Sequence, residues 1–132
     1  MVLRSVFFVI PALSLFACTA PVSETSGKHL YEKHCTSCHG STAKGDGPLA
    51  GEFTVPPSDL TTLQQNNNGV FPAVDVMAQI NGYSGRHQFG GMPEFEEDLQ
   101  GKTVQWKAPS GVVIPTPRAL LDIAVYLESI QE

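Results

Sequence analysis

Cys35-Thr36-Ser37-Cys38-His39 is the stretch of sequence that decides the fold. Two thiols at positions i and i+3 lie about one helical turn apart, so both can add to the two vinyl groups of one porphyrin. The histidine that follows then lies beneath the ring, with its Nε2 directed at the iron. The spacing therefore predicts one covalently attached haem c, with Cys35 and Cys38 as thioether donors and His39 as the proximal axial ligand.

Two other chemistries use a pair of cysteines at this spacing. A zinc site needs a second pair of ligands, and none follows at the usual interval. A thioredoxin-type dithiol belongs with a βαβ pattern, and the sequence has no such pattern. Haem attachment is the interpretation that the rest of the chain supports.

The N-terminus has the pattern of an export signal. An apolar run over residues 6–17 is interrupted by Pro11 and is too short to cross a bilayer of roughly 30 Å as a helix. It ends in Leu15-Phe16-Ala17-Cys18, which resembles the lipobox of bacterial lipoproteins. Ordinary signal peptidase cleavage after Ala20, with Cys18 discarded, is the alternative. Both interpretations export the chain, to the periplasmic side of a membrane.

The cysteine count favours the lipoprotein interpretation. The chain has three cysteines, an odd number for an exported protein, and lipidation of Cys18 leaves a pair. We therefore predict a signal peptide over residues 1–17, a lipidated tether over 18–26 and one domain over 27–132. The small and polar residues that precede residue 27 suit a tether.

Composition limits the classes of partner. With 132 residues the chain has room for one domain, and 42% hydrophobic and 16% charged residues are typical of a globular protein. Its net charge of −5 does not provide the basic surface that phosphate backbones require, so we expect no nucleic-acid partner.

From the cysteine motif onward the chain resembles the class I cytochrome c family. That family carries a glycine and an aromatic residue before the first cysteine, where its N-terminal helix contacts its C-terminal helix. Gly27 and Tyr31 have this spacing in a helix that we expect from Gly27 to Cys35, with Ser26 as its N-cap. The resemblance implies a mostly α, single-domain cytochrome c fold wrapped around one covalently attached haem.

The C-terminal helix has a strong start signal and a clear apolar stripe. Thr116 is the expected N-cap, and Pro117 is the expected first helical residue. Apolar residues then recur at intervals of three and four, at Leu120, Ile123, Ala124 and Leu127. We expect Ile123 and Tyr126 to meet the N-terminal helix.

A methionine is the expected second iron ligand. Met92 lies in Gly90-Gly91-Met92-Pro93-Glu94-Phe95, the pattern in which bacterial class I cytochromes carry their distal ligand, so the resemblance assigns it that role. Alternatively, Met92 only fills the core. Met77 is a weaker competitor, because it belongs to an apparent helix over 73–81 with a buried face of Val74, Met77 and Ile80.

Three histidines outside the motif are also possible iron ligands. His29 and His34 precede the motif on the first helix, and we expect both to face solvent. His87 lies shortly before Met92, either as a sixth ligand or as a loop residue near the haem edge.

The loop after the motif resembles its counterpart in bacterial relatives. There a proline carbonyl accepts the Nδ1 proton of the proximal histidine, a bond that fixes the ring and raises its basicity. The resemblance assigns this bond to Pro48 and packing on the haem to Leu49. A plain surface turn is the alternative.

The chain departs from the family over residues 99–115. Two short runs, over 103–106 and 112–114, flank a turn and predict a β-hairpin inserted before the C-terminal helix. Trp106 is expected either to cover a haem edge or to pack under its own loop.

These observations predict a monohaem c-type cytochrome with His/Met ligation, acting as a periplasmic, membrane-tethered one-electron carrier and not as an enzyme. The alternatives are a haem enzyme or gas-sensing cytochrome with an open sixth position, and a fixed electron-transfer subunit of a dehydrogenase or oxidase complex. Acidic residues after Met92 favour redox partners with a basic docking surface, and they are Glu94, Glu96, Glu97 and Asp98.

Overall fold

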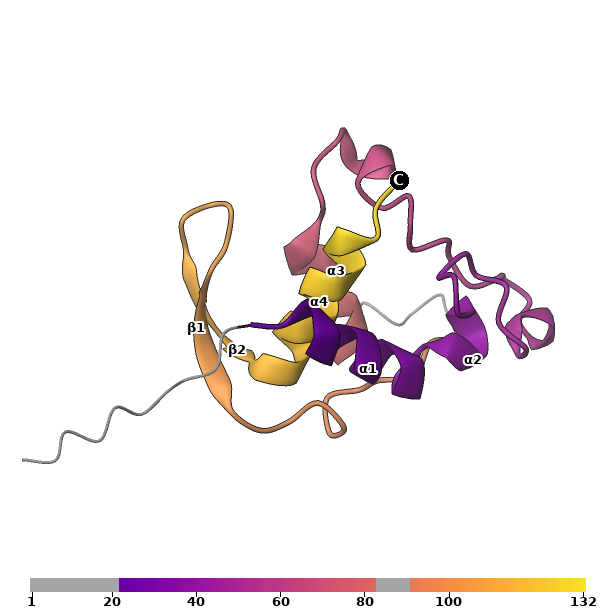
Figure 1. The fold of residues 1–132 in the computed structure, drawn as a ribbon, viewed down its shortest axis with the longest axis horizontal. Coiled ribbons are helices and arrows are strands. Elements are labelled where there is room, and N and C mark those ends of the chain that lie inside the picture. Colours follow the sequence, from indigo (N-terminus) through magenta and orange to yellow (C-terminus); the bar gives the residue numbers. More distant parts are fainter. Residues whose placement is uncertain (1–21, 83–90) are drawn as a thin grey trace, which may run out of the picture.

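The computed structural model describes residues 22–82 and 91–132. The elements follow in the order α1 (Glu24–His34), α2 (Thr36–His39), η1 (Ala50–Glu52), η2 (Gln65–Asn67), α3 (Ala73–Asn81), β1 (Thr103–Lys107), β2 (Val113–Pro117) and α4 (Arg118–Ser129). Helices and loops thus dominate, with one small two-stranded sheet, as the sequence predicts (Figure 1). Across the described residues, no helix combines the length and the apolar character needed to cross a bilayer.

Helix α1 begins earlier than the sequence suggests. Ser23 has an extended backbone, and its side chain accepts a hydrogen bond from the backbone N–H of Ser26 at 3.3 Å. Glu24 in the first turn adds negative charge where the helix dipole favours it. The assignment of Ser26 as the cap is therefore wrong, because Ser23 already satisfies one of the free amide groups.

The contact between α1 and α4 depends on Gly27. A Cβ atom at Gly27 would overlap the backbone carbonyl of Asp122 and approach Cβ of Tyr126. One turn further along, the rings of Tyr31 and Tyr126 meet with centroids 5.4 Å apart. The predicted contact between the two helices is confirmed for Tyr126, and the backbone of Asp122 also meets α1 at Gly27.

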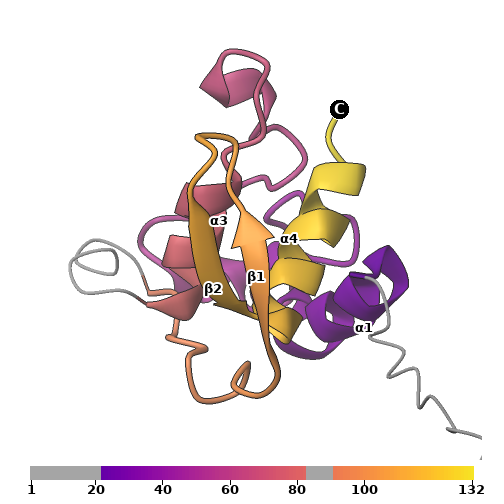
Figure 2. The same cartoon turned by 90° about the vertical axis from the view of Figure 1, so that its left-hand side faces the viewer.

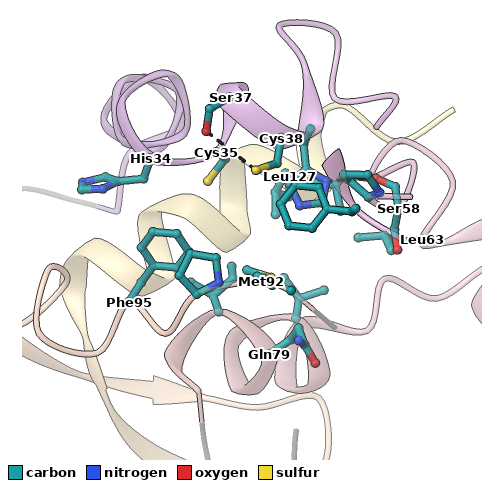
Figure 3. A pocket seen from close by; sticks show the side chains of 18 of the residues that line it. His34, Cys35, Ser37, Cys38, Ser58, Leu63, Gln79, Met92, Phe95 and Leu127 are labelled. Atoms are coloured by element: carbon teal, nitrogen blue, oxygen red, sulfur yellow. Dashed lines mark hydrogen bonds between the residues drawn. The ribbon is translucent and has the colours of Figure 1, made fainter. Parts of the chain in front are cut away.

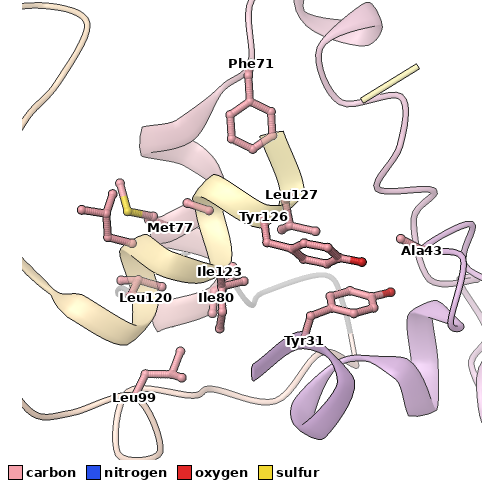
Figure 4. Packing of buried hydrophobic residues seen from close by; sticks show 12 residues of the cluster. Tyr31, Ala43, Phe71, Met77, Ile80, Leu99, Leu120, Ile123, Tyr126 and Leu127 are labelled. Carbon is pink, nitrogen blue, oxygen red and sulfur yellow. The ribbon is translucent and has the colours of Figure 1, made fainter. Parts of the chain in front are cut away.

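The apolar stripe of α4 forms the centre of the core, as predicted. Leu120, Ile123, Ala124 and Leu127 are each at most 3% exposed. They pack together with Tyr31, Phe71, Met77, Ile80 and Leu99 (Figure 4). Helix α4 contacts α1, α3 and β2, so it joins the N-terminal helix, the middle of the chain and the hairpin.

The start of α4 differs from the prediction by about one residue. The helix begins at Arg118, after Pro117 with an extended ψ of 130°. Thr116 belongs to β2, and its hydroxyl donates to the carbonyl of Ile114 at 3.0 Å, so it does not cap the helix. The strand leads directly into the helix and leaves no residue for a side-chain cap.

Helix α3 covers the residues that the sequence assigns to it. Met77 and Ile80 are buried as expected. Val74 is 46% exposed, so its assignment to the buried face is wrong: it lies in the first turn, while Ala78 and Asn81 are buried in the later turns.

The predicted hairpin before α4 is confirmed. Strands β1 and β2 are antiparallel, with Trp106 opposite Ile114. Figure 1 shows the hairpin at one side of the helices and α2 at the opposite side, and Figure 2 looks onto the hairpin. Trp106 is half-buried and packs against the core cluster.

The residues after α4 fasten a long loop to the core. The side-chain amide of Gln131 accepts from the backbone N–H of Gln64 at 2.8 Å and donates to the carbonyl of Leu60 at 2.7 Å. The backbone N–H of Glu132 donates to the carbonyl of Thr61 at 2.9 Å. These bonds hold the segment around residues 58–64 in place, and that segment forms one wall of the site.

Candidate haem site

The cysteine motif lies at the junction of α1 and α2. Cys35 ends α1, and its carbonyl accepts from the backbone N–H of Cys38 at 3.2 Å and of His39 at 2.9 Å. The two thiols therefore lie one turn apart, as the spacing predicts, and both are free and half-buried.

Tyr31 forms hydrogen bonds at both ends of this motif. Its carbonyl accepts from the backbone N–H of Cys35 at 2.8 Å, and its hydroxyl donates to the carbonyl of Gly40 at 2.7 Å. Burial, followed by the charges of Cys35 and Tyr126, raises the pKa of Tyr31 well above its usual range, so the hydroxyl keeps its proton and remains a donor. Tyr31 thus positions the motif as well as filling the interface with α4.

The motif opens onto a cavity of about 540 Å³. This volume lies within the range of roughly 300–1,000 Å³ typical of cofactor sites. Most of the lining is apolar, and it comes from segments far apart in the sequence (Figure 3). The lining residues include Cys35, Cys38, His39, Phe53, Val55, Pro56, Pro57, Ser58, Leu60, Leu63, Val76, Gln79, Ile80, Met92, Pro93, Phe95 and Leu127.

His39 is oriented by a backbone carbonyl. Its Nδ1 lies 2.9 Å from the carbonyl oxygen of Ser58. A carbonyl oxygen can only accept, so Nδ1 carries the proton and the lone pair of Nε2 is available to a metal. Such a bond fixes the ring and raises the basicity of a ligating histidine.

The sequence assigned this carbonyl to Pro48, and the assignment is wrong. The loop that contains Pro48 turns its amide groups toward the end of α2 instead: Gly45, Gly47 and Leu49 donate to the carbonyls of the last three helical residues at 2.9, 3.0 and 2.9 Å. A helix leaves its last carbonyls without internal partners, and this loop supplies donors to them.

Leu49 and Trp106 do not reach the cavity. Leu49 is 40% exposed and is not among the lining residues, so its packing on the haem stays a prediction. Trp106 packs against the core on the hairpin side, which supports the alternative in which it does not cover a haem edge.

Met92 lines the same cavity as the thiols and His39. On the N-terminal side of Met92, the backbone of Gly91 packs closely on Phe53, because a Cβ atom at Gly91 would overlap the ring of Phe53. On the C-terminal side, the backbone N–H of Phe95 donates to the carbonyl of Ile80 at 3.2 Å. The competitor Met77 is 5% exposed, belongs to the core and does not line the cavity.

The histidines outside the motif differ in their surroundings. His29 is exposed, as expected. His34 is half-buried and lines the cavity, so the expectation that it faces solvent is wrong. Its ring meets the ring of Phe95, a residue brought to it by the fold from a distant part of the chain. His87 and the predicted lipidation site, Cys18, lie outside the described residues.

The thiol environment argues against a redox dithiol. Burial, and secondarily the neighbouring Cys38, raises the pKa of the Cys35 thiol to about 12. A disulfide oxidoreductase needs a lowered pKa, because the thiolate is the attacking species. Cys35 is instead a neutral thiol in an apolar cavity.

The donor set fits a haem. Two thiols, an imidazole with a free Nε2 lone pair and a thioether line one largely apolar cavity. Thioether and imidazole together are the axial pair of cytochromes c, and the thiols supply the covalent attachment.

Comparison with known proteins agrees with this interpretation. The family model of cytochrome C oxidase, cbb3-type, subunit III matches residues 23–108. No curated protein matches the chain. Among solved structures, a chain of the reducing HAO-like protein complex of Kuenenia stuttgartiensis is 24% identical, with a TM-score of 0.55, which shows similarity of fold. The match covers 83% of this chain and 44% of that one, so the present chain spans less than half of that relative.

The match to the family model covers most of the chain, including the cysteine motif and Met92. The chain therefore belongs to the cytochrome c oxidase, cbb3-type, subunit III family and is a class I c-type cytochrome that carries covalently bound haem c.

Proposed function

We propose that this cytochrome is a membrane-tethered, one-electron carrier whose iron is ligated by His39 and Met92. The observation that carries the proposal is that these two side chains, from distant segments, line one cavity together with both cysteine thiols. A filled pair of axial positions leaves no place for a substrate on the iron, which favours electron transfer over catalysis.

The haem and the residues around it have separate roles in electron transfer. The haem iron supplies the change between the ferric and ferrous states. The carbonyl of Ser58 holds His39 in one orientation, so its bond to the metal needs no rearrangement. The thioether of Met92 favours the reduced state and raises the reduction potential. The largely apolar lining would limit the access of water to the iron.

The Met92 ligation is tested by a matched pair of substitutions, Met92→Leu and Met77→Leu. Leucine conserves volume and typically costs less than about 1.5 kcal/mol in place of methionine, but it removes the sulfur. We expect Met92→Leu to lose the sulfur-to-iron charge-transfer band, to lower the reduction potential by on the order of 0.1 V, and to bind carbon monoxide rapidly when reduced. Met77→Leu is expected to retain the wild-type spectrum and potential.

Two results would contradict this assignment. The first is a wild-type ferrous protein that already binds carbon monoxide rapidly, which would favour an enzyme or gas sensor with an open sixth position. The second is a charge-transfer band that survives in Met92→Leu and disappears in Met77→Leu.

The tether and the location are part of the proposal. The lipobox-like sequence before Cys18 supports lipidation there and export to the periplasmic side of a membrane. A lipid at Cys18 would confine the haem domain near the membrane surface, within reach of membrane-bound redox enzymes.

A partner with a basic surface fits the segment that follows Met92. Glu94, Glu96, Glu97 and Asp98 are exposed next to a residue that lines the haem cavity. Opposite charge on a partner would raise the rate of encounter, and salt would weaken that effect.

The family name favours a second candidate, a fixed subunit of a terminal oxidase. The two candidates differ in how mild detergent extracts of host membranes behave at low and raised salt. A carrier docked by charge is expected to separate from other redox proteins by about 0.5 M salt, at which the Debye length is below about 5 Å. Copurification with an oxidase at that salt concentration would establish the fixed subunit instead.

A further inference from the structure

His34 links the haem-attachment segment to the segment that carries Met92. It lies directly before Cys35, lines the cavity and is half-buried. Its ring meets the ring of Phe95 in an edge-on arrangement, with centroids 5.8 Å apart and planes at 73° (Figure 3). This geometry is one that aromatic pairs prefer.

Packing against Phe95 contributes to the position of the His34 ring. Its Nε2 is buried and has no hydrogen-bond partner among the residues that the structure describes. A buried polar atom without a partner disfavours the observed position, so the contacts of the ring must outweigh that cost. The contact with Phe95 is therefore the feature of His34 that an apolar aromatic residue can reproduce.

Two other contacts of the Met92 segment join it to parts of the chain outside the cysteine motif. Gly91 packs on Phe53, and the backbone N–H of Phe95 donates to Ile80. The ring of His34 adds a contact with the residue that precedes the first thioether. The Met92 segment therefore contacts the same part of the chain to which the haem is attached.

We propose that His34 is a positioning residue that holds the Met92 segment against the haem through its edge contact with Phe95. This inference rests on the proposed ligation by Met92. Without this contact, the Met92 segment moves away from the haem more often. The sixth coordination position of the iron is then open to an external ligand for a larger fraction of the time. Apparent affinity for such a ligand rises in proportion to that fraction.

Imidazole titration of the ferric, haem-loaded protein tests the inference. The loss of the sulfur-to-iron charge-transfer band reports displacement of Met92. We expect His34→Ala to bind imidazole about 3- to 10-fold more tightly than wild type, the range that corresponds to loss of one aromatic pair. His34→Phe, which retains an aromatic edge without the buried nitrogen, is expected to stay within about twofold of wild type.

His29→Ala is the matched control, because His29 is an exposed histidine of the same helix. A double-mutant cycle with Phe95→Leu isolates the pair, and the effect of His34→Ala is expected to disappear in the Phe95→Leu background. An unchanged imidazole affinity in His34→Ala, or an equal gain in His34→Phe, overturns the positioning role alone. Absence of the charge-transfer band from wild type overturns the Met92 ligation, and this inference with it.

Discussion

Haem-free protein is expected to show no cooperative unfolding transition. The cavity has a volume of about 540 Å³ and is walled by residues of α1, α2, α3, α4 and two loops. Without the haem, the apolar side chains that line it would lose their packing partners and face water. The haem is therefore a large part of the core.

The double variant Cys35→Ala, Cys38→Ala is the means to prepare such protein. We expect reduced far-UV circular dichroism, a broad thermal transition and little near-UV signal, as in a molten globule. Ser37→Ala is the control, since it changes an exposed residue of the same motif and keeps both thiols. Native helix content with a sharp melting transition in the double variant would show that the polypeptide folds without its cofactor.

Gly27→Ala is expected to destabilise the haem-loaded protein by about 2–3 kcal/mol. Alanine in place of a helical glycine ordinarily stabilises by about 0.5–1 kcal/mol. The sign reverses here because the new methyl group would overlap the carbonyl of Asp122 and must push α1 away from α4. Separation of the helices also disturbs the contact between Tyr31 and Tyr126. Guanidinium unfolding of the ferric protein measures the loss.

Gly51→Ala is the matched substitution, because a Cβ at Gly51 would meet nothing within 4 Å. We expect its free energy of unfolding to remain within about 0.5 kcal/mol of wild type. Equal stability of Gly27→Ala and Gly51→Ala would show that the two helices do not approach each other as closely as the structure has them.

The sequence predicts well those elements that have a regular hydrophobic pattern or a cysteine spacing required by covalent haem attachment. The spacing of Cys35 and Cys38 requires one helical turn, and the structure has that turn as α2. Intervals of three and four residues placed the core face of α4, and two short runs on either side of a turn placed the hairpin. These patterns involve residues that are close in the sequence, so they can be recognised without knowledge of the fold.

The wrong predictions for Pro48 and His34 depend on backbone groups or on distant residues. Any residue can offer the carbonyl that Ser58 presents to His39, so no side-chain pattern distinguishes it from Pro48. The last carbonyls of α2 have no partners within the helix and accept hydrogen bonds from the loop around Pro48. These hydrogen bonds set the course of that loop. His34 is half-buried because Phe95 reaches it from a distant segment, and a helical pattern within α1 cannot reveal that.

The central claim is that one haem is fastened to this chain through Cys35 and Cys38, and intact mass spectrometry of the denatured protein tests it most directly. The account predicts that protein from a host able to mature cytochromes c carries the mass of one haem, retained on the peptide with these cysteines. Acyl chains on an N-terminal Cys18 would appear in the same spectrum. A polypeptide mass without haem, or a haem lost on denaturation, would contradict the account.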